Sequence, residues 1–175
     1  MRIFLVRHGE TNWNLNNLLQ GKSEIELNDT GKKQASNVKE KLINIKFDAC
    51  FSSPLKRAIQ TSKIITDGDI IIDERLIERD LGLLEGKNRE SYDAKLYWDY
   101  KLNSSFNEVE CIQHLLARTE DFIKYLKEEY NDKTILIVSH GATIRALHFV
   151  IKGYNENTDF LTLNVPNCCV FEYYL

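Results

Sequence analysis

The sequence predicts an α/β protein in which helices cover both faces of a mostly parallel central sheet. Short, continuously apolar runs at residues 3–6 and 135–138 are typical of strands that are buried on both faces. Amphipathic segments with helical spacing separate such runs, and strands that alternate with helices form parallel sheets. The fold class follows from these two observations.

The chain begins with the strand at residues 3–6, which runs directly into polar residues. A polar loop is expected over residues 9–27, followed by a helix for which Asn28 is a suitable N-cap. One stripe of this helix is apolar and is predicted to be buried: Ala35, Val38, Leu42 and Ile45.

The next unit is the stretch FDACFSSPLKRAIQTSKII at residues 47–65. It predicts a strand that ends near Ser52, followed by a helix with Ser53 as its N-cap and Pro54 at its first position. The helix is predicted to bury four apolar side chains: Leu55, Ala58, Ile59 and Ile65.

The second half of the chain continues the alternation. DIIID at residues 69–73 predicts a short strand, TILIVSH at 134–140 a buried strand, and CCVFEYYL at 168–175 a last strand. A helix is expected to begin at Gly141 and to stop near Gly153. A long amphipathic helix before the buried strand is marked by its apolar positions: Ile112, Leu115, Leu116, Phe122, Ile123 and Leu126.

Length and composition limit the kind of protein. A chain of 175 residues with 43% hydrophobic and 28% charged residues predicts one globular domain over residues 1–175. The net charge of −3 gives no general basic surface, so we expect neither nucleic acid nor a membrane as a partner. The absence of a membrane-spanning run and of a signal peptide predicts a cytoplasmic location. The sequence carries no signal of oligomeric state.

The four cysteines lack the spacing of metal ligands: Cys50, Cys111, Cys168 and Cys169. The last two are sequence neighbours, an arrangement that rarely closes a disulfide, so we predict reduced thiols. His114 and His148 lie within helical patterns, where structural or surface roles are favoured.

Polar residues follow three of the predicted strands, at residues 7–9, 52–57 and 139–141. If these strands are neighbours, two histidines and two arginines meet at one sheet edge, beside two helix amino termini. Arginine presents a planar, charged fork that suits phosphate oxygens, and helix N–H groups add their dipoles. The pattern predicts an anion site in which the protein itself neutralises the charge, with no metal.

Four motifs occur in order along the chain: LVRHGET at 5–11, SSPLKRAIQT at 52–61, LIERDLGLLEG at 76–86 and VSHGATIRAL at 138–147. Together they resemble the histidine phosphatase superfamily, the group that includes cofactor-dependent phosphoglycerate mutases. The resemblance spans nearly the whole chain. It implies a three-layer α/β/α sandwich and a mechanism through a phosphohistidine.

The resemblance also implies roles for individual residues. By position, His8 is the nucleophile and Glu78 the proton donor. The phosphate pocket consists of Arg7, Arg57 and His140, and the loop NWNLNNLLQG adds substrate contacts from Asn14, Gln20 and Gly21.

Chemistry supports these roles independently of the resemblance. Neutral imidazole is a competent nucleophile near pH 7, and cations beside His8 disfavour its protonated form. The second ring nitrogen is expected to donate to a backbone carbonyl. Glu78 has acidic neighbours that compete for the role of general acid: Glu74, Asp80 and Glu85.

The chain departs from the family pattern on the substrate side. Many members carry an arginine near the position of Leu18 and a D-x-P-L element where this chain has EIEL at 24–27. The segment 87–107 is rich in aromatic residues, and it predicts either a lid over the pocket or a satellite core.

The predicted function is a metal-independent phosphomonoester hydrolase, without a cofactor, that acts on a small phosphorylated metabolite. Two alternatives stay open. A phosphoglycerate-type mutase would rebind its phosphorylated intermediate, but mutases of this family are generally longer, with inserted segments around the site. A regulatory module would bind phosphate without turnover, which the presence of every principal chemical position disfavours.

Overall fold

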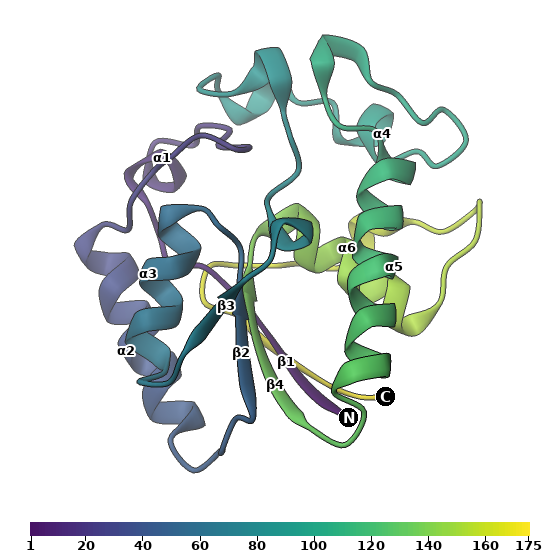
Figure 1. Ribbon diagram of the computed structural model, residues 1–175. Helices are drawn as coiled ribbons and strands as arrows, with labels where there is room; N and C mark the ends of the chain where they lie inside the picture. The colour runs from purple at the N-terminus through teal and green to yellow at the C-terminus, as the bar shows by residue number, and fades with distance from the viewer.

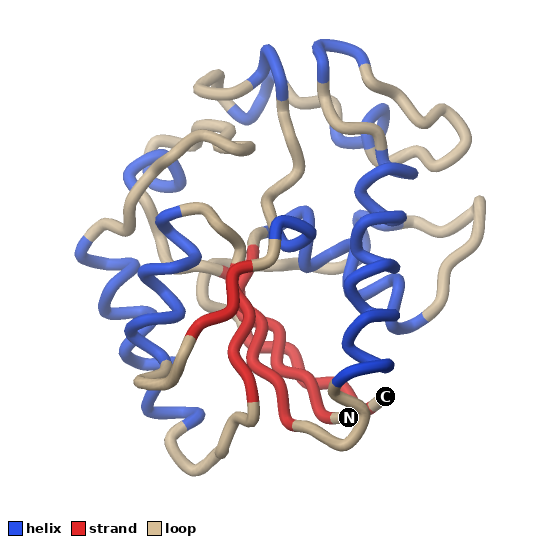
Figure 2. Tube along the Cα trace, viewed as in Figure 1, coloured by secondary structure: helices blue, strands red, loops and turns tan.

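The computed structural model describes all 175 residues and contains a five-stranded sheet with the order β3-β2-β4-β1-β5. The strands are β1 (Arg2–Arg7), β2 (Ala49–Ser52), β3 (Ile70–Ile72), β4 (Thr134–Ser139) and β5 (Val170–Tyr174). The first four run parallel to one another, and β5 pairs antiparallel with β1 (Figure 2). The predicted mostly parallel sheet is confirmed.

Helices form a layer on each side of this sheet. The helices of the chain are α1 (Asn12–Leu15), α2 (Asp29–Leu42), α3 (Lys56–Ile65), α4 (Ala94–Tyr97), α5 (Ile112–Glu129) and α6 (Gly141–Lys152), and the layers consist of α2, α3, α5 and α6. In Figure 1, α2 and α3 lie on one side of the strands and α5 and α6 on the other. The three-layer α/β/α sandwich is therefore confirmed as well.

The continuous apolar run of β1 is explained by its two buried faces. Ile3 and Leu5 belong to the core under α5 and α6, whereas Phe4 and Val6 belong to the core under α2 and α3. All four side chains are at most 2% exposed, and burying one such side chain stabilises a fold by about 1.5–3 kcal/mol. Since β1 lies between β4 and β5, this burial anchors the half of the sheet that ends in β5.

The predicted start of the second helix is wrong. Ser53 is not its N-cap, because the Ser53 N–H still bonds the carbonyl of Val138, 3.0 Å away, as if β2 continued. Leu55 is the N-cap instead, and α3 begins at Lys56.

The predicted loop 9–27 contains the short helix α1, which the sequence did not predict.

The segment between β3 and α5 has five short elements and arches over the carboxyl ends of the strands (Figure 1). Its aromatic residues have features of both alternatives stated for residues 87–107, the lid over the pocket and the satellite core. Tyr97 and Trp98 are buried in satellite cores, and Tyr92 and Trp98 also line a cavity. None of the helices is both long and apolar enough to cross a membrane.

Candidate active site

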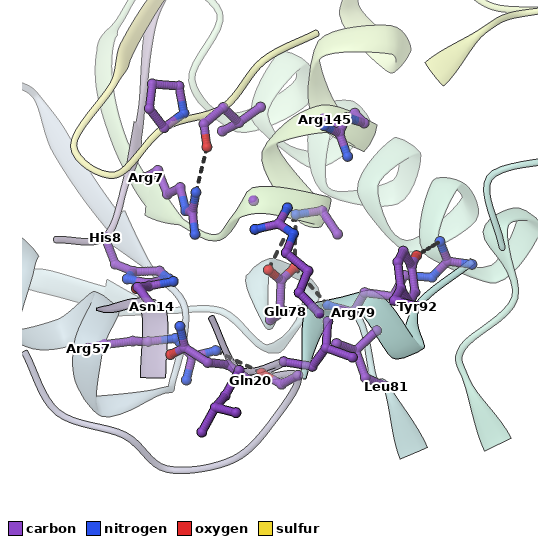
Figure 3. Close-up of a pocket in the computed structure, with 18 of the residues that line it drawn as sticks. Arg7, His8, Asn14, Gln20, Arg57, Glu78, Arg79, Leu81, Tyr92 and Arg145 are labelled. Carbon is purple, nitrogen blue, oxygen red and sulfur yellow. Dashed lines mark hydrogen bonds between the residues drawn. The ribbon is translucent and has the colours of Figure 1, made fainter. Parts of the chain in front are cut away.

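The three polar strand ends meet at one edge because β4 lies between β1 and β2. Arg7 stands opposite Ser139 in the register of β1 and β4, and Ser52 stands opposite Val138 in that of β2 and β4. The residues that follow these strands are therefore neighbours. They border a cavity of about 350 Å³, a volume suited to a small molecule (Figure 3).

His8 lies at this cavity with one nitrogen engaged and one free. Its Nδ1 lies 2.7 Å from the carbonyl oxygen of Gly9, so Nδ1 carries the proton and donates it to that oxygen. Nε2 has no bond to a protein group. Burial lowers the pKa of His8 well below its usual value, and the charges of Arg57 and Arg7 lower it further, so the ring is neutral near pH 7.

Two arginines flank His8. Arg7 donates from Nη1 to the carbonyl of Val165 at 2.6 Å, while its buried Nε has no partner. Arg57 is fully buried and donates to the carbonyls of Gly21 and Ser23, at 2.7 and 2.8 Å. Burial lowers the pKa of Arg57 to about 10, which leaves it charged at neutral pH.

His140 lies next to His8, with 5.1 Å between the ring centroids, but it does not line the cavity. Its Nδ1 accepts a hydrogen bond from Arg57 Nε at 3.2 Å, and its Nε2 lies 2.7 Å from the hydroxyl oxygen of Ser53. Both ring nitrogens are therefore occupied by protein groups. In this arrangement His140 orients Arg57, and the hydroxyl predicted to cap a helix holds His140.

Glu78 is the only acidic residue that lines the cavity. Its Oε1 accepts from the backbone N–H groups of Ala142 and Thr143, at 3.1 and 3.2 Å, and from that of Arg79 at 2.9 Å. The first two donors belong to the amino terminus of α6. A Cβ built on Gly141 would lie 3.7 Å from Arg7 Cζ and 3.8 Å from Glu78 Oε2, so both groups face one space.

Two of the acidic neighbours of Glu78 have other partners, and the third is exposed. Glu85 accepts from the N–H of Lys22 at 2.7 Å and from the hydroxyl of Ser23, which fixes the loop that follows Gln20. Asp80 forms an ion pair with Lys22 and accepts from the N–H of Gly82. Glu74 is exposed.

The three residues of the predicted substrate loop all line the cavity. Asn14 accepts from Thr11 through its Oδ1 as part of a capping box, and the carbonyl of Gly21 accepts from Arg57. Gln20 is 8% exposed, and its buried Oε1 has no hydrogen-bond partner. An unpaired buried acceptor at a cavity wall is available to a ligand.

Sequence reasoning missed three further cavity residues, which are Arg79, Arg89 and Arg145, and it placed Tyr92 and Trp98 only within the segment 87–107, for which a lid and a satellite core were both open. Arg145 had a signal, because it stands four residues after Gly141 on the same face of α6. Arg79 directly follows Glu78. Arg89, Tyr92 and Trp98 come from a segment whose position depends on contacts far away in the sequence.

The remaining histidines lie outside the cavity. Nδ1 of His114 lies 2.6 Å from Glu110, and Nδ1 of His148 lies 2.7 Å from the hydroxyl of Tyr173. No group of three or more histidine, cysteine, aspartate or glutamate side chains is arranged to hold a metal ion.

The fold and the cavity define a class of protein. A neutral imidazole with a free nitrogen, two guanidiniums beside it and a carboxylate across the cavity, all at the carboxyl edge of an α/β sandwich, suit phosphoryl transfer. The family model of the histidine phosphatase superfamily, branch 1, matches residues 3–174. The chain belongs to this superfamily, and it is a phosphatase-like or mutase-like member of it.

Individual relatives agree with this assignment. The chain is 38% identical over 171 residues to the uncharacterized phosphatase PhoE of Bacillus subtilis, covering 96% of this chain and 85% of that protein. It is 36% identical to a 2,3-bisphosphoglycerate-dependent phosphoglycerate mutase of Cytophaga hutchinsonii, covering 83% of this chain and 74% of the mutase.

Solved structures share the fold. A mutant phosphoserine phosphatase from Entamoeba histolytica in complex with phosphoserine has a TM-score of 0.83 and 29% identity, covering 99% of this chain and 90% of that one. Phosphoserine phosphatase from the same organism in complex with 3-phosphoglyceric acid has a TM-score of 0.81. Proteins of this fold therefore bind small phosphorylated metabolites.

Proposed function

We propose that residues 1–175 form one catalytic domain that hydrolyses a small phosphorylated metabolite through a phosphohistidine at His8, without a metal. The observation that carries the proposal is the state of His8. Its proton is held on Nδ1 by the carbonyl of Gly9, and the free Nε2 belongs to a neutral ring between two arginines. This is the state that a nucleophilic imidazole requires.

The first half-reaction transfers the phosphoryl group. His8 Nε2 attacks phosphorus, and the bond from phosphorus to the ester oxygen of the substrate breaks. Arg7 and Arg57 stabilise the transferring oxygens, and Arg7 Nε offers a donor that no protein group uses. The ring becomes positively charged when its second nitrogen is substituted, and the Gly9 carbonyl stabilises that charge.

Glu78 gives its proton to the departing oxygen. Oε1 is held by three backbone N–H groups, whereas Oε2 has only a 3.3 Å contact with the N–H of Ala142. Oε2 is therefore the oxygen that exchanges the proton. In the second half-reaction a water attacks phosphorus, its proton passes to Glu78, and His8 leaves as the neutral imidazole.

His140 supports the phosphate site through Arg57. It fixes Arg57 Nε and leaves the guanidinium aimed at the cavity. This role is a positioning role, because neither ring nitrogen of His140 is free.

A trapping experiment tests the mechanism. Rapid quenching during turnover of a ³²P-labelled monoester, with a chelator present, is expected to give one covalent phosphate on His8 that survives alkali and is lost in acid. His8→Ala should give no label, whereas His140→Ala should turn over slowly and label only at His8. Label on a serine, on His140 or nowhere during rapid turnover would contradict the proposal.

The same incubations separate the alternatives. Inorganic phosphate released as fast as substrate disappears indicates a hydrolase, and interconversion of 2- and 3-phosphoglycerate without release indicates a mutase. Phosphate binding without either reaction indicates a regulatory module. The nucleophile, the two arginines and Glu78 at one cavity favour catalysis over a regulatory module.

A further inference from the structure

The proton of His8 is held by a backbone carbonyl, and the direction of a carbonyl depends on what fixes its peptide unit. The carbonyl of Gly9, 2.7 Å from His8 Nδ1, belongs to the peptide unit that joins Gly9 to Glu10. The other neutral tautomer of His8 carries the proton on Nε2, which then has no lone pair to offer to phosphorus. The nucleophile therefore depends on the groups that hold this peptide unit.

The two polar groups of the Gly9–Glu10 peptide unit have one partner each. The carbonyl oxygen accepts from His8 Nδ1, and the N–H, which belongs to Glu10, donates to Gln34 Oε1 at 2.9 Å. Only the oxygen of an amide side chain can accept, so this bond defines the orientation of the Gln34 amide. A chain of hydrogen bonds therefore connects Gln34, through one peptide unit, to the imidazole.

Gln34 reaches this N–H because the start of α2 lies directly against the backbone after His8. A Cβ added at Gly9 would overlap the carbonyl oxygen of Gly31, and one added at Gly31 would overlap that of Glu10. Gln34 follows Gly31 by three residues and lies on the same face of α2. The close approach of two backbones at glycines thus brings a side chain of α2 to Glu10.

The neighbouring peptide unit, between His8 and Gly9, is held by other groups. The N–H of Gly9 donates to Thr61 Oγ1 at 3.1 Å, and the carbonyl of His8 accepts from Asn167 Nδ2 at 3.0 Å. With this unit fixed, the Gly9 carbonyl can turn only about the bonds of Gly9, whose backbone is less restricted than that of any other residue type. Gln34 is the one side chain outside His8 that is bonded to the unit that would turn.

Gln34 also affects the strength of the bond to His8. An N–H that donates to an acceptor polarises its peptide unit, so the carbonyl of the same unit becomes a better acceptor. The ring of His8 is positively charged when Nε2 carries the phosphoryl group, and the Gly9 carbonyl then faces that charge. A stronger carbonyl acceptor therefore favours formation of the phosphohistidine.

We propose that Gln34 is a positioning residue for the nucleophile: through the Gly9–Glu10 peptide unit it keeps the proton of His8 on Nδ1 and leaves Nε2 free to attack phosphorus. This inference rests on the proposed function, in which His8 accepts the phosphoryl group. Gln34 does not line the cavity, so its effect reaches the substrate only through His8.

Substitution of Gln34 tests the proposal. Gln34→Met keeps the length of the side chain and removes the acceptor. It should lower the rate constant for phosphorylation of His8 by p-nitrophenyl phosphate, measured by rapid quenching, by about three- to tenfold, the weight of one hydrogen bond. The affinity for inorganic phosphate should stay at the native value, because Arg7 and Arg57 are unchanged. Gln34→Glu keeps an acceptor oxygen and should restore most of the rate.

Gln60→Met is the matched control. Gln60 Oε1 accepts from the N–H of Leu27 at 2.8 Å, so Gln60 forms the same kind of bond from a position of similar burial, and neither residue lines the cavity. This variant should keep the native rate of phosphorylation. Equal losses of rate in Gln34→Met and Gln60→Met, or equal losses of rate and of phosphate affinity in Gln34→Met, would show that Gln34 only stabilises the fold.

Nuclear magnetic resonance of the protein with ¹⁵N-labelled histidine separates this inference from the proposed function, because it needs no turnover. The Nδ1–H signal of His8, identified by its loss in His8→Ala, should move upfield and exchange faster with water in Gln34→Met, and Gln60→Met should leave it unchanged. If the native protein forms no phosphohistidine, the proposed function fails, whereas this shift would still support the role of Gln34 in holding the proton. An unchanged Nδ1–H signal in Gln34→Met would overturn the inference whether or not the protein is a phosphatase.

Discussion

The chemistry of His8 depends on atoms of its own neighbours in the sequence. The carbonyl of Gly9 fixes the tautomer, and burial, Arg57 and the preceding residue Arg7 lower the pKa of the ring. The motif RHG thus contains the nucleophile, one cation and the group that sets the proton. These roles explain why a fully buried apolar strand runs directly into the polar residues Arg7 and His8.

Glu78 should be separable from its acidic neighbours by substitution. Glu78→Gln should lower kcat by about 10²- to 10⁴-fold with an alkyl phosphate, because the departing alkoxide needs a proton. An activated aryl phosphate, whose leaving group needs less protonation, should lose less. The measurement is steady-state kinetics with both substrates.

Glu85→Gln is the matched control, since Glu85 bonds the loop at Lys22 and Ser23 and does not line the cavity. It should affect both substrates alike and by less than Glu78→Gln. A larger loss in Glu85→Gln, or equal losses for both substrates in Glu78→Gln, would assign the acid role elsewhere.

At the scale of elements, the loop after Gln20 is held by its glycine. Gly21 has φ +49°, and an added Cβ would lie 2.0 Å from Glu85 Oε1. We expect Gly21→Ala to lower the free energy of unfolding by about 1–3 kcal/mol through backbone strain and to raise KM, because the Gly21 carbonyl orients Arg57. Urea unfolding and steady-state kinetics measure the two effects.

Gly68→Ala provides the control for that prediction. A Cβ on Gly68 would meet only the Thr66 hydroxyl at 3.5 Å, and Gly68 does not have a positive φ. Its unfolding free energy and KM should stay close to those of the native protein. Equal behaviour of the two variants would show that the loop tolerates a side chain at Gly21.

Elements with local signals were predictable from the sequence. Asn28 caps α2 by accepting from Gly31 N–H at 2.8 Å, and Gly153, with φ +87°, ends α6. Ser53 has an equally good local signal, but its hydroxyl bonds His140, which is 87 residues away. A residue pattern does not reveal such a competing long-range partner.

The residues of the site also divide into those that the sequence could place and those that it could not. The groups on strand ends, such as His8 and Arg57, could be placed because parallel topology brings those ends together. Trp98 could not be placed, because it lies in a segment held by side-chain contacts. Arg79 fixes that segment by bonding the carbonyls of Tyr97 and Glu110, 18 and 31 residues away. The sequence therefore predicted the phosphate end of the cavity better than the part that Trp98 lines.

At the scale of the whole molecule, the buried histidines couple the site to global stability. His8 and His140 are at most 2% exposed, and burial with nearby Arg57 lowers the pKa of both well below the usual value. The unfolded chain has ordinary histidines with pKa about 6.5, so below that pH it binds protons that the folded protein does not. Folding stability must therefore fall as pH decreases below about 6.5.

This coupling predicts the slope of stability against pH. Between pH 6.5 and 5, each of the two histidines should reduce the unfolding free energy by up to about 1.4 kcal/mol per pH unit, measured by urea unfolding. His8→Asn and His140→Asn should each reduce the slope, and the double variant should flatten most of it. His114→Gln changes an exposed histidine outside the cavity and should keep the native slope. If the double variant kept that slope as well, the acid sensitivity would arise from groups other than these two histidines. That result would contradict the conclusion that His8 and His140 are neutral in the folded protein.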